Sequence, residues 1–213
     1  MSYDRFGDIE LIPIVKHGRE RPDLDYKAPM NWHECTRREK AELVRDMMAL
    51  ANSDKPGYIV IGAADAGGVV GTYDGLSNKQ VESFDPSKIA DKVKRYASPE
   101  VRFELYKPAV DGNKYVVIRV LPFESVPHIC INSCNDVLEE AAIYVRGEGA
   151  RTIRVQSAEY MRRLVDRAIQ ISADTLLDGI RRLVRTSREK KAQVSKPFES
   201  QMADMSRQLS KDG

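Results

Sequence analysis

Three acidic residues and a lysine in the first third of the sequence have the types and spacing for metal-assisted hydrolysis. Asp25 and Lys27 lie two positions apart where polar and apolar residues alternate, so a β-strand would point both to one face. Glu20 precedes this segment, and Asp65 follows an apolar run. Converging carboxylates bind hard divalent cations, which polarise a phosphoryl oxygen and generate hydroxide. The alternative is that these acids serve turns and solvated surfaces, because the chain has 32 Asp and Glu residues.

One short segment has the residue types and spacing of a possible zinc site. It contains His128, Cys130 and Cys134. A closed zinc site needs four nitrogen or sulfur ligands, and only the distant Cys35 is left to complete it. We therefore expect buried structural thiols in a strand and no zinc.

The positive charge of the chain is concentrated in its last third. Residues 146–213 hold 15 Lys and Arg against 9 Asp and Glu, a net +6, which leaves 19 against 23, or −4, for residues 1–145. Arginine donates two parallel hydrogen bonds to phosphate, so an anionic partner such as nucleic acid is one explanation, and a solvated basic helix is the other. The candidate phosphate contacts are Arg146, Arg151, Arg154, Arg162 and Arg163.

The elements that would position these residues are short strands and amphipathic helices. The sequence predicts an α/β (α+β) fold with a mixed, largely antiparallel sheet flanked by helices over residues 8–170, followed by a helical extension and polar tail over residues 171–213. Expected strands are 9–15, 23–27, 58–64, 69–71, 101–107, 114–121, 128–131 and 142–146; expected helices begin after Thr36, Asp85 and Ser157, with a second C-terminal helix from about Ser172 to Lys191.

Composition narrows the class of protein. Hydrophobic residues make up 42% and charged residues 31%, which is typical of a soluble globular chain and excludes collagen-like and wholly disordered classes. No apolar run approaches the roughly 18 residues of a membrane span, and the first residues lack the layout of a signal peptide. We therefore expect a cytoplasmic protein with no membrane partner.

Several segments, taken in order, resemble one family. The similarity extends over about residues 18–168 and identifies the chain as similar to the AlbA_2 (Schlafen-core, formerly AAA_4) domain. The segments are Glu20, Leu24-Asp25-Tyr26-Lys27, the predicted helix ending Ala49-Leu50-Ala51-Asn52, the run from Tyr58 to Gly68, Val126-Pro127-His128, Ile143-Tyr144-Val145-Arg146-Gly147 and Ile153-Arg154.

The resemblance implies an α/β fold that handles nucleic acid, and in animal Schlafens a metal-assisted endoribonuclease acting on tRNA and rRNA. It places Glu20, Asp25 and Asp65 at the three metal-binding acidic positions, with Mg²⁺ or Mn²⁺ as the implied ion. The strand spacing of Asp25 and Lys27, and not the resemblance, predicts that Lys27 places a positive charge beside the attacked phosphate. The middle acid is Asp25 where the family usually has Glu. His128 and Cys130 match a zinc-binding His-x-Cys pair, but the later adjacent cysteine pair is missing.

Two functions stay open at this point. One is a nucleic-acid-binding protein that cuts RNA; the other is a non-catalytic binding or regulatory module, such as a subunit of an anti-phage defence system. RNA is favoured over DNA as partner, and ATP is not expected because no G-x-x-x-x-G-K-[ST] loop is present. The apolar stripe from Leu176 to Val184 needs a partner, which is either the domain itself or another subunit. By analogy with Schlafens, which use two lobes of this domain, we favour a homodimer, with a protein partner for the C-terminal helices as an alternative.

Overall fold

In this computed structural model the backbone is described for residues 8–134 and 136–209, and the side chains for residues 10–134 and 136–186. The contacts divide the chain into two compact units, residues 1–168 and residues 169–213. The first unit holds all the strands that the structure describes.

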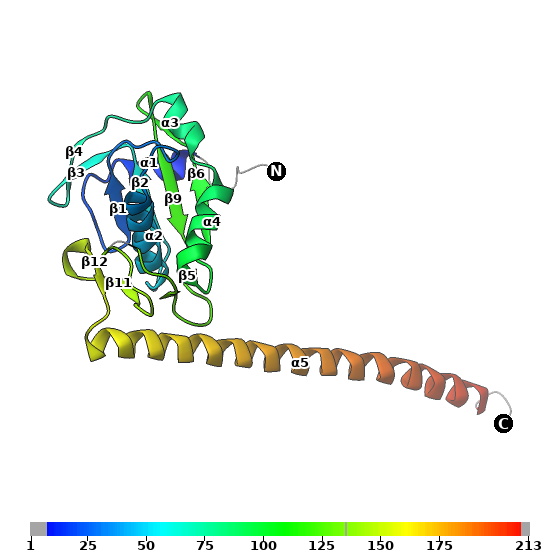
Figure 1. Ribbon diagram of the computed structural model, residues 1–213. Helices are drawn as coiled ribbons and strands as arrows, with labels where there is room; N and C mark the ends of the chain where they lie inside the picture. The colour runs from blue at the N-terminus through cyan, green and yellow to red at the C-terminus, as the bar shows by residue number, and fades with distance from the viewer. Residues whose placement is uncertain (1–7, 135, 210–213) are drawn as a thin grey trace. The chain divides into compact units, whose positions relative to one another are not determined.

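A four-stranded mixed sheet forms the centre of the first unit (Figure 1). Its strands lie in the order β1 (Leu24–Lys27), β2 (Gly57–Ile61), β9 (Val116–Val120) and β6 (Phe103–Tyr106). β1 runs parallel to β2, and the other two pairs are antiparallel. The predicted mixed, largely antiparallel sheet with flanking helices is confirmed.

Both faces of this sheet are covered, which explains why its central strands are continuously apolar. On one face, Ile59 and Ile61 pack in a core with helices α2 (Arg37–Ala51) and α4 (Pro86–Tyr96). On the other face, the intervening Val60 packs with α1 (Asp8–Val15). The alternation of side chains along β2 therefore assigns neighbouring residues to different cores.

The two covering helices begin where the sequence predicts. The Thr36 side chain accepts a hydrogen bond from the Glu39 amide, and the Glu39 carboxylate accepts one from the Thr36 amide, which completes a capping box. Asp85 caps α4 through the amide of Ser87, with Pro86 in the first turn.

The N-terminal segment differs from its expectation. Residues 9–15, expected as a strand, form α1, with Pro13 inside it. Leu11 and Val15, four residues apart, are both fully buried, so the helical spacing of these two residues decides the structure.

Four two-stranded ribbons complete the first unit. β3 (Ala64–Ala66) pairs with β4 (Val69–Thr72), β7 (Ala109–Val110) with β8 (Asn113–Lys114), β5 (Ala97–Ser98) with β10 (Ile129–Cys130), and β11 (Tyr144–Arg146) with β12 (Thr152–Arg154). The expected strand 58–64 ends early at Gly62, whose φ of +116° breaks the extended backbone. The short helix α3 (Asn78–Ser83) and the 3₁₀ turn Glu148–Ala150 lie between strands.

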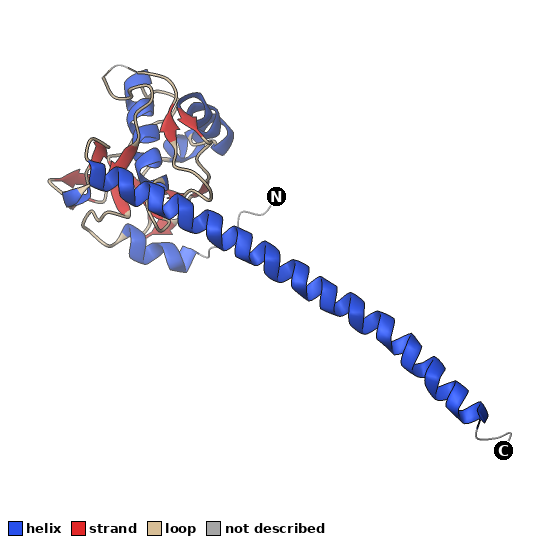
Figure 2. Ribbon diagram, turned by 90° about the horizontal axis from the view of Figure 1, so that it is seen from below, coloured by secondary structure: helices blue, strands red, loops and turns tan. Residues whose placement is uncertain are grey.

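The C-terminal helix is one element and not two. α5 (Ala158–Leu209) runs without interruption through the break expected near Ser172 (Figure 2). The segment from Ile169 to Ser172 contains no proline or glycine, so no residue there ends the helix. The helix also continues beyond Pro197, where a polar tail was expected. Among the described residues, none of the helices combines the length and apolar character needed to span a membrane.

Candidate functional site

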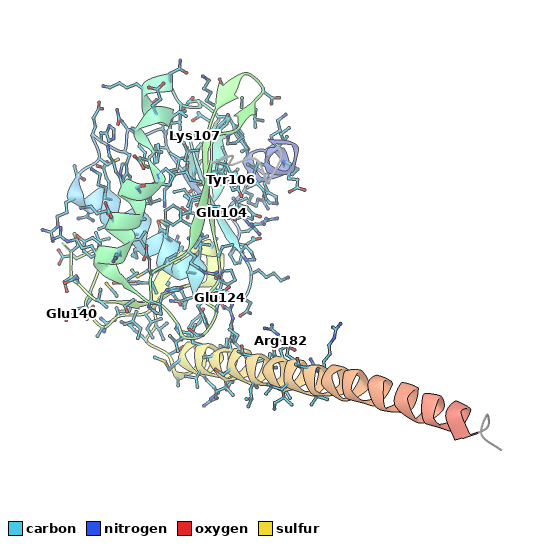
Figure 3. All side chains as sticks on the ribbon, turned by 90° about the vertical axis from the view of Figure 1, so that its right-hand side faces the viewer. Glu104, Tyr106, Lys107, Glu124, Glu140 and Arg182 are labelled. Atoms are coloured by element: carbon cyan, nitrogen blue, oxygen red, sulfur yellow. The ribbon has the colours of Figure 1, made fainter. Side chains whose placement is uncertain are left out.

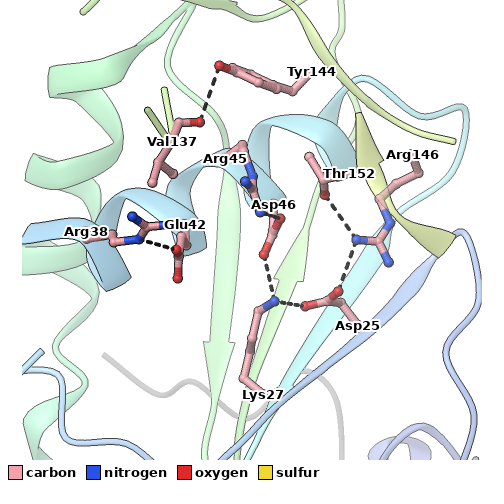
Figure 4. Close-up of polar contacts among 10 residues, drawn as sticks. All are labelled: Asp25, Lys27, Arg38, Glu42, Arg45, Asp46, Val137, Tyr144, Arg146 and Thr152. Atoms are coloured by element: carbon pink, nitrogen blue, oxygen red, sulfur yellow. Dashed lines mark hydrogen bonds and ion pairs between the residues drawn. The ribbon is translucent and has the colours of Figure 1, made fainter. Parts of the chain in front are cut away.

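A chain of buried and partly buried charges connects the edge of the central sheet to α2 and to the β11–β12 ribbon (Figure 4). We call Asp25, Lys27, Arg45, Asp46 and Arg146 the charge network. The Lys27 ammonium lies 2.8 Å from the Asp25 carboxylate and 2.7 Å from that of Asp46. The other oxygen of Asp25 lies 3.0 Å from Nη1 of Arg146, and Arg45 lies 3.5 Å from Asp46.

Three elements supply these side chains. The period of two along β1 puts Asp25 and Lys27 on the same face, as the sequence predicts, where they face α2. Asp46 comes from α2, and Arg146 comes from β11, which packs against α2. Nη1 of Arg146 also donates to Oγ1 of Thr152 on the partner strand β12, at 3.2 Å.

Mutual neutralisation keeps Lys27 and Asp46 ionised. Burial alone would raise the pKa of the Asp46 carboxyl, but the charges of Lys27 and Arg45 outweigh it and the pKa is lowered. Burial alone would lower the pKa of Lys27, yet Asp46 and Asp25 raise it. The Lys27 ammonium and the Asp46 carboxylate therefore stabilise each other's charged forms.

Glu20 and Asp65 lie beside this network. Burial raises the pKa of the Glu20 carboxyl, and the nearby charges of Asp25 and Asp65 raise it further. The Glu20 carboxylate accepts a hydrogen bond from the amide of Tyr26 at 3.4 Å. Its own amide donates to the carbonyl of Gly68 at 2.9 Å, which fixes it to the β3–β4 ribbon that carries the exposed Asp65. The structure thus brings the three predicted acids into one neighbourhood.

These acids do not fit a shared divalent cation as they are arranged here. Each oxygen of Asp25 already contacts a cationic side chain, Lys27 or Arg146. Across residues 10–134 and 136–186, no group of three or more His, Cys, Asp or Glu side chains is placed to hold a metal ion. Asp25 and Lys27 therefore have a structural role in this arrangement, as partners in the charge network.

Sequence reasoning missed Asp46, Arg45 and Thr152. The signal for Asp46 was present, because it lies three residues after Leu43 and four before Leu50, on the apolar side of α2. A carboxylate at such a position is expected to have a buried cationic partner. No pattern in the sequence distinguishes Arg45 or Thr152.

The candidate phosphate-binding arginines fall into three groups. Arg146 has a side chain only 2% exposed and is held by Asp25, so it is a structural residue and not an accessible phosphate contact. Arg154 pairs with Glu139, and Arg163 pairs with Glu159 one turn earlier on α5. Arg151 and Arg162 are exposed.

An open pocket of about 490 Å³ lies between the end of α2, β11 and the first turns of α5. Its basic lining residues are Lys55, Arg146, Arg163 and Arg167, and Tyr160 contributes an aromatic ring. The Arg167 guanidinium lies over the ring of Phe123, 4.1 Å from its centroid, and donates to the carbonyl of Ser53. The pocket thus combines cations and an aromatic side chain within the first unit.

The cysteines and histidine of the candidate zinc motif are buried in the first unit. The His128 ring nitrogen Nδ1 lies 2.7 Å from the carbonyl of Pro99, and burial lowers the pKa of this histidine. Cys130 and Cys134 are buried free thiols, and burial raises the pKa of Cys130. Cys35 is partly exposed.

Comparison with known proteins decides the family. The family model described as Schlafen, AlbA_2 matches residues 20–158, more than half of the 213-residue chain. The chain belongs to the Schlafen AlbA_2 family. The match includes Glu20, the charge network and both strands of the β11–β12 ribbon, so these lie within the Schlafen AlbA_2 domain. The pocket extends past the matched residues to Tyr160, Arg163 and Arg167.

Two solved structures are similar to this Schlafen AlbA_2 chain at low identity. The DIP2311 protein from Corynebacterium diphtheriae is 15% identical with a TM-score of 0.44; the match covers 72% of this chain and 31% of that one. The N-terminal domain of a protein from Nitrosomonas europaea, described as ATP-dependent DNA helicase RecG-related, is 18% identical with a TM-score of 0.37, covering 55% and 74%. At these TM-scores neither likeness supports a conclusion about this chain. No curated protein matches it.

Proposed function

We propose that this Schlafen AlbA_2 chain binds nucleic acid, with RNA favoured over DNA, through arginines around the β11–β12 ribbon and the start of α5. The observation that carries the proposal is the clustering of Arg151, Arg154, Arg162 and Arg163 on these adjacent segments of the first unit. Guanidinium groups on a surface of this kind bind the phosphates of a strand.

The neighbouring pocket supports the same function. Its exposed cations, Lys55 and Arg163, can contact phosphate, while Tyr160 on its wall has a ring on which a base can stack. Single-stranded RNA offers unpaired bases for such stacking, and double-stranded DNA does not.

The proposal is tested with fluorescence anisotropy on tRNA and single-stranded DNA. The double variant Arg151→Glu/Arg162→Glu is expected to bind roughly tenfold more weakly or worse, with a slope of log K against log salt reduced by about 1.4, or about 0.7 for each lost phosphate contact.

A matched control is Lys107→Glu, at an exposed cation that Figure 3 shows at the end of the first unit remote from the β11–β12 ribbon of Figure 1. It should bind as the wild type does. This single reversal changes the net charge by half as much as the double variant does. A loss of binding free energy half as large as that of the double variant would therefore show that net charge, and not this surface, accounts for binding.

We propose RNA cleavage as a second, separable function. The observation that favours it is the position of Glu20, whose carboxylate accepts from the Tyr26 amide next to Asp25 and whose amide donates to Gly68 in the ribbon that carries Asp65. Burial raises the pKa of the Glu20 carboxyl, and the charges of Asp25 and Asp65 accordingly raise it further. Mg²⁺ or Mn²⁺ would supply the Lewis acid if the site binds one, although the acids do not fit a shared ion as arranged here.

Cleavage is tested by incubating tRNA with the protein, with and without Mn²⁺, and resolving the products on a denaturing gel. The double variant Glu20→Gln/Asp65→Asn spares the charge network, so a loss of cutting in it is not a loss of folding. Intact tRNA with the wild-type protein, or equal cutting by the variant, contradicts cleavage through these acids. Binding without cutting supports the non-catalytic module, such as a defence-system subunit.

A further inference from the structure

A second basic surface lies on the first unit, where α2 and α4 contact each other over one face of the central sheet (Figure 1). Its cations come from the first turn of α2 and from one side of α4. We call them the α2–α4 patch: Arg37, Lys40, Lys88, Lys92 and Arg95. The patch lies within residues 1–145, which hold 19 Lys and Arg against 23 Asp and Glu, so a charge sum over that segment conceals it.

Contacts of these side chains bring the cations of the two helices onto one surface. Spacings of four and three residues put the three α4 cations on the same side of that helix. The Arg95 guanidinium lies 5.8 Å from the ring centroid of Tyr96, and Nε of Arg37 lies 3.4 Å from the hydroxyl of the same tyrosine. The Lys88 ammonium lies 3.1 Å from Nε2 of His33, which precedes α2. The row on α4 therefore lies along the start of α2.

No carboxylate neutralises the α2–α4 patch. Among the side chains that the structure describes, no Asp or Glu makes an ion pair with any of its five cations. Acids on the same segments are engaged elsewhere: Glu42 pairs with Arg38, Glu34 pairs with Lys79, and Glu39 closes the capping box. α4 itself holds four Lys and Arg and one Asp.

The positive charges of the patch act on one another. Burial lowers the pKa of Lys92, and the charges of Arg95, Lys40 and Arg37 lower it further. A phosphate bound among these side chains would offset their repulsion and would accept charge-assisted hydrogen bonds from them. The patch therefore favours a partner with several negative charges.

The composition of the patch distinguishes nucleic acid from protein as that partner. The cores of protein interfaces are depleted in lysine, but three of the five patch residues are lysines. None of the exposed large apolar side chains of the described residues lies on α2 or α4. The aromatic rings beside the patch, Trp32 and Tyr96, are buried, so an unpaired base has no ring there on which to stack. Only phosphates can be contacted.

We propose that the α2–α4 patch binds the phosphate backbone of a nucleic-acid duplex. The three α4 cations span about 10 Å at 1.5 Å of rise per residue, which matches about three phosphates of one strand at about 3.4 Å each. A duplex holds its phosphates in a fixed row, as α2 and α4 hold the cations. The inference rests on the proposed nucleic-acid function and adds to it a second surface, for paired segments.

Fluorescence anisotropy tests the patch with a blunt-ended RNA duplex, the matching DNA duplex and a poly-uridine strand. Lys92→Glu/Arg95→Glu is expected to bind a duplex roughly tenfold more weakly or worse, with the slope of log K against log salt reduced by about 1.8, or about 0.9 for each lost contact. Its binding of poly-uridine should weaken less. Binding of the RNA duplex alone would assign the patch to A-form RNA, and binding of both duplexes to either backbone.

The matched control is Lys94→Glu/Lys107→Glu, which changes the net charge equally and should bind a duplex as the wild type does. Lys94 lies about 100° or more around α4 from each patch residue of that helix, and both Lys94 and Arg95 lie in its last turn, so the effect on the helix dipole is matched. Circular dichroism checks that each variant is folded.

Several outcomes would overturn the inference. They are a wild type that binds neither duplex, even if it binds polyglutamate as a model of an acidic protein, equal losses of duplex binding in the patch and control variants, and a loss of poly-uridine binding as large as the loss of duplex binding. If Arg151→Glu/Arg162→Glu binds poly-uridine as the wild type does, the proposed single-strand surface fails, while loss of duplex binding in the patch variant still supports this inference.

Discussion

Asp25 is a buried carboxylate whose two oxygens contact different cations, and this decides what its loss would do. Removing its charge leaves Arg146, 2% exposed, without a counter-charge. We expect Asp25→Asn to lower the free energy of unfolding by about 3 kcal/mol or more, measured by urea unfolding without added metal.

The control for Asp25 is Asp65→Asn, since Asp65 is exposed. It should change the unfolding free energy by no more than about 0.5 kcal/mol. A similar small change in both variants would show that the charge network contributes nothing to folding.

Glu20 should make the free energy of unfolding decrease as pH rises. A glutamate whose pKa is lowered on folding has the opposite effect. The folded pKa of Glu20 is raised above 4.5, so the folded state binds the proton more tightly than the unfolded state does. Stability is therefore lost as pH rises from about 4.5 through the folded pKa. We expect Glu20→Gln to be more stable than the wild type at pH 7, with the difference vanishing below about pH 4.5 in thermal unfolding scans. A difference that does not change with pH would contradict this origin.

Sequence patterns predict residue contacts within one element better than contacts between elements. The shared face of Asp25 and Lys27 follows from strand geometry alone and is confirmed by their 2.8 Å contact. Lys27 also pairs with Asp46, and Asp25 pairs with Arg146. These partners lie 19 or more positions away in the sequence, so only packing of the elements brings them together. Arg146 is a candidate phosphate contact in the sequence because it is an arginine. Packing places it against Asp25, where its side chain is buried and structural.

At the scale of elements, Asn52 connects the end of α2 to β11 and to His128, the residue before β10. Its side-chain amide donates to the carbonyls of His128 and Tyr144, and its carbonyl accepts from the His128 amide. All three bonds are buried, so removing the side chain leaves backbone groups without partners. We expect Asn52→Ala to cost about 3 kcal/mol or more in urea unfolding.

Asn132→Ala is the matched control for Asn52. Asn132 is exposed and its side chain makes one hydrogen bond, to the carbonyl of Arg95. We expect a cost of about 1 kcal/mol. Equal losses of unfolding free energy at the two positions would show that the three buried hydrogen bonds of Asn52 stabilise the fold no more than the single exposed one of Asn132.

Local sequence signals correctly predict the elements that begin with a clear capping motif. They fail where the sequence has no clear start or stop signal. The Thr36 capping box and the Asp85-Pro86 start place α2 and α4 correctly. The segment 9–15 has apolar residues at both strand and helix spacings. It forms a helix because that spacing buries Leu11 and Val15 together in the core that contains Val60. The break expected in α5 near Ser172 rested on no helix-ending residue.

At the scale of the whole molecule, the net charge of +2 conceals an acidic first part and a basic last third. If four arginines contact single-stranded RNA, the slope of log K against log salt should be about −3, or about −0.7 for each contact. Binding should then weaken about 50-fold between about 50 and about 200 mM salt, measured by anisotropy. A slope near zero would contradict phosphate binding.

The link between Glu20 and Gly68 has a consequence for motion. The Glu20 amide donates to Gly68, and the Val70 amide donates back to Gly18, so two hydrogen bonds join the loop before β1 to the β3–β4 ribbon. When the ribbon lifts from the loop, both bonds break together. In native-state hydrogen exchange the amide protons of Glu20 and Val70 should therefore open with one shared free energy, below that of the β2 amides in the core. Their protection measures the free energy needed to separate Asp65 from Glu20.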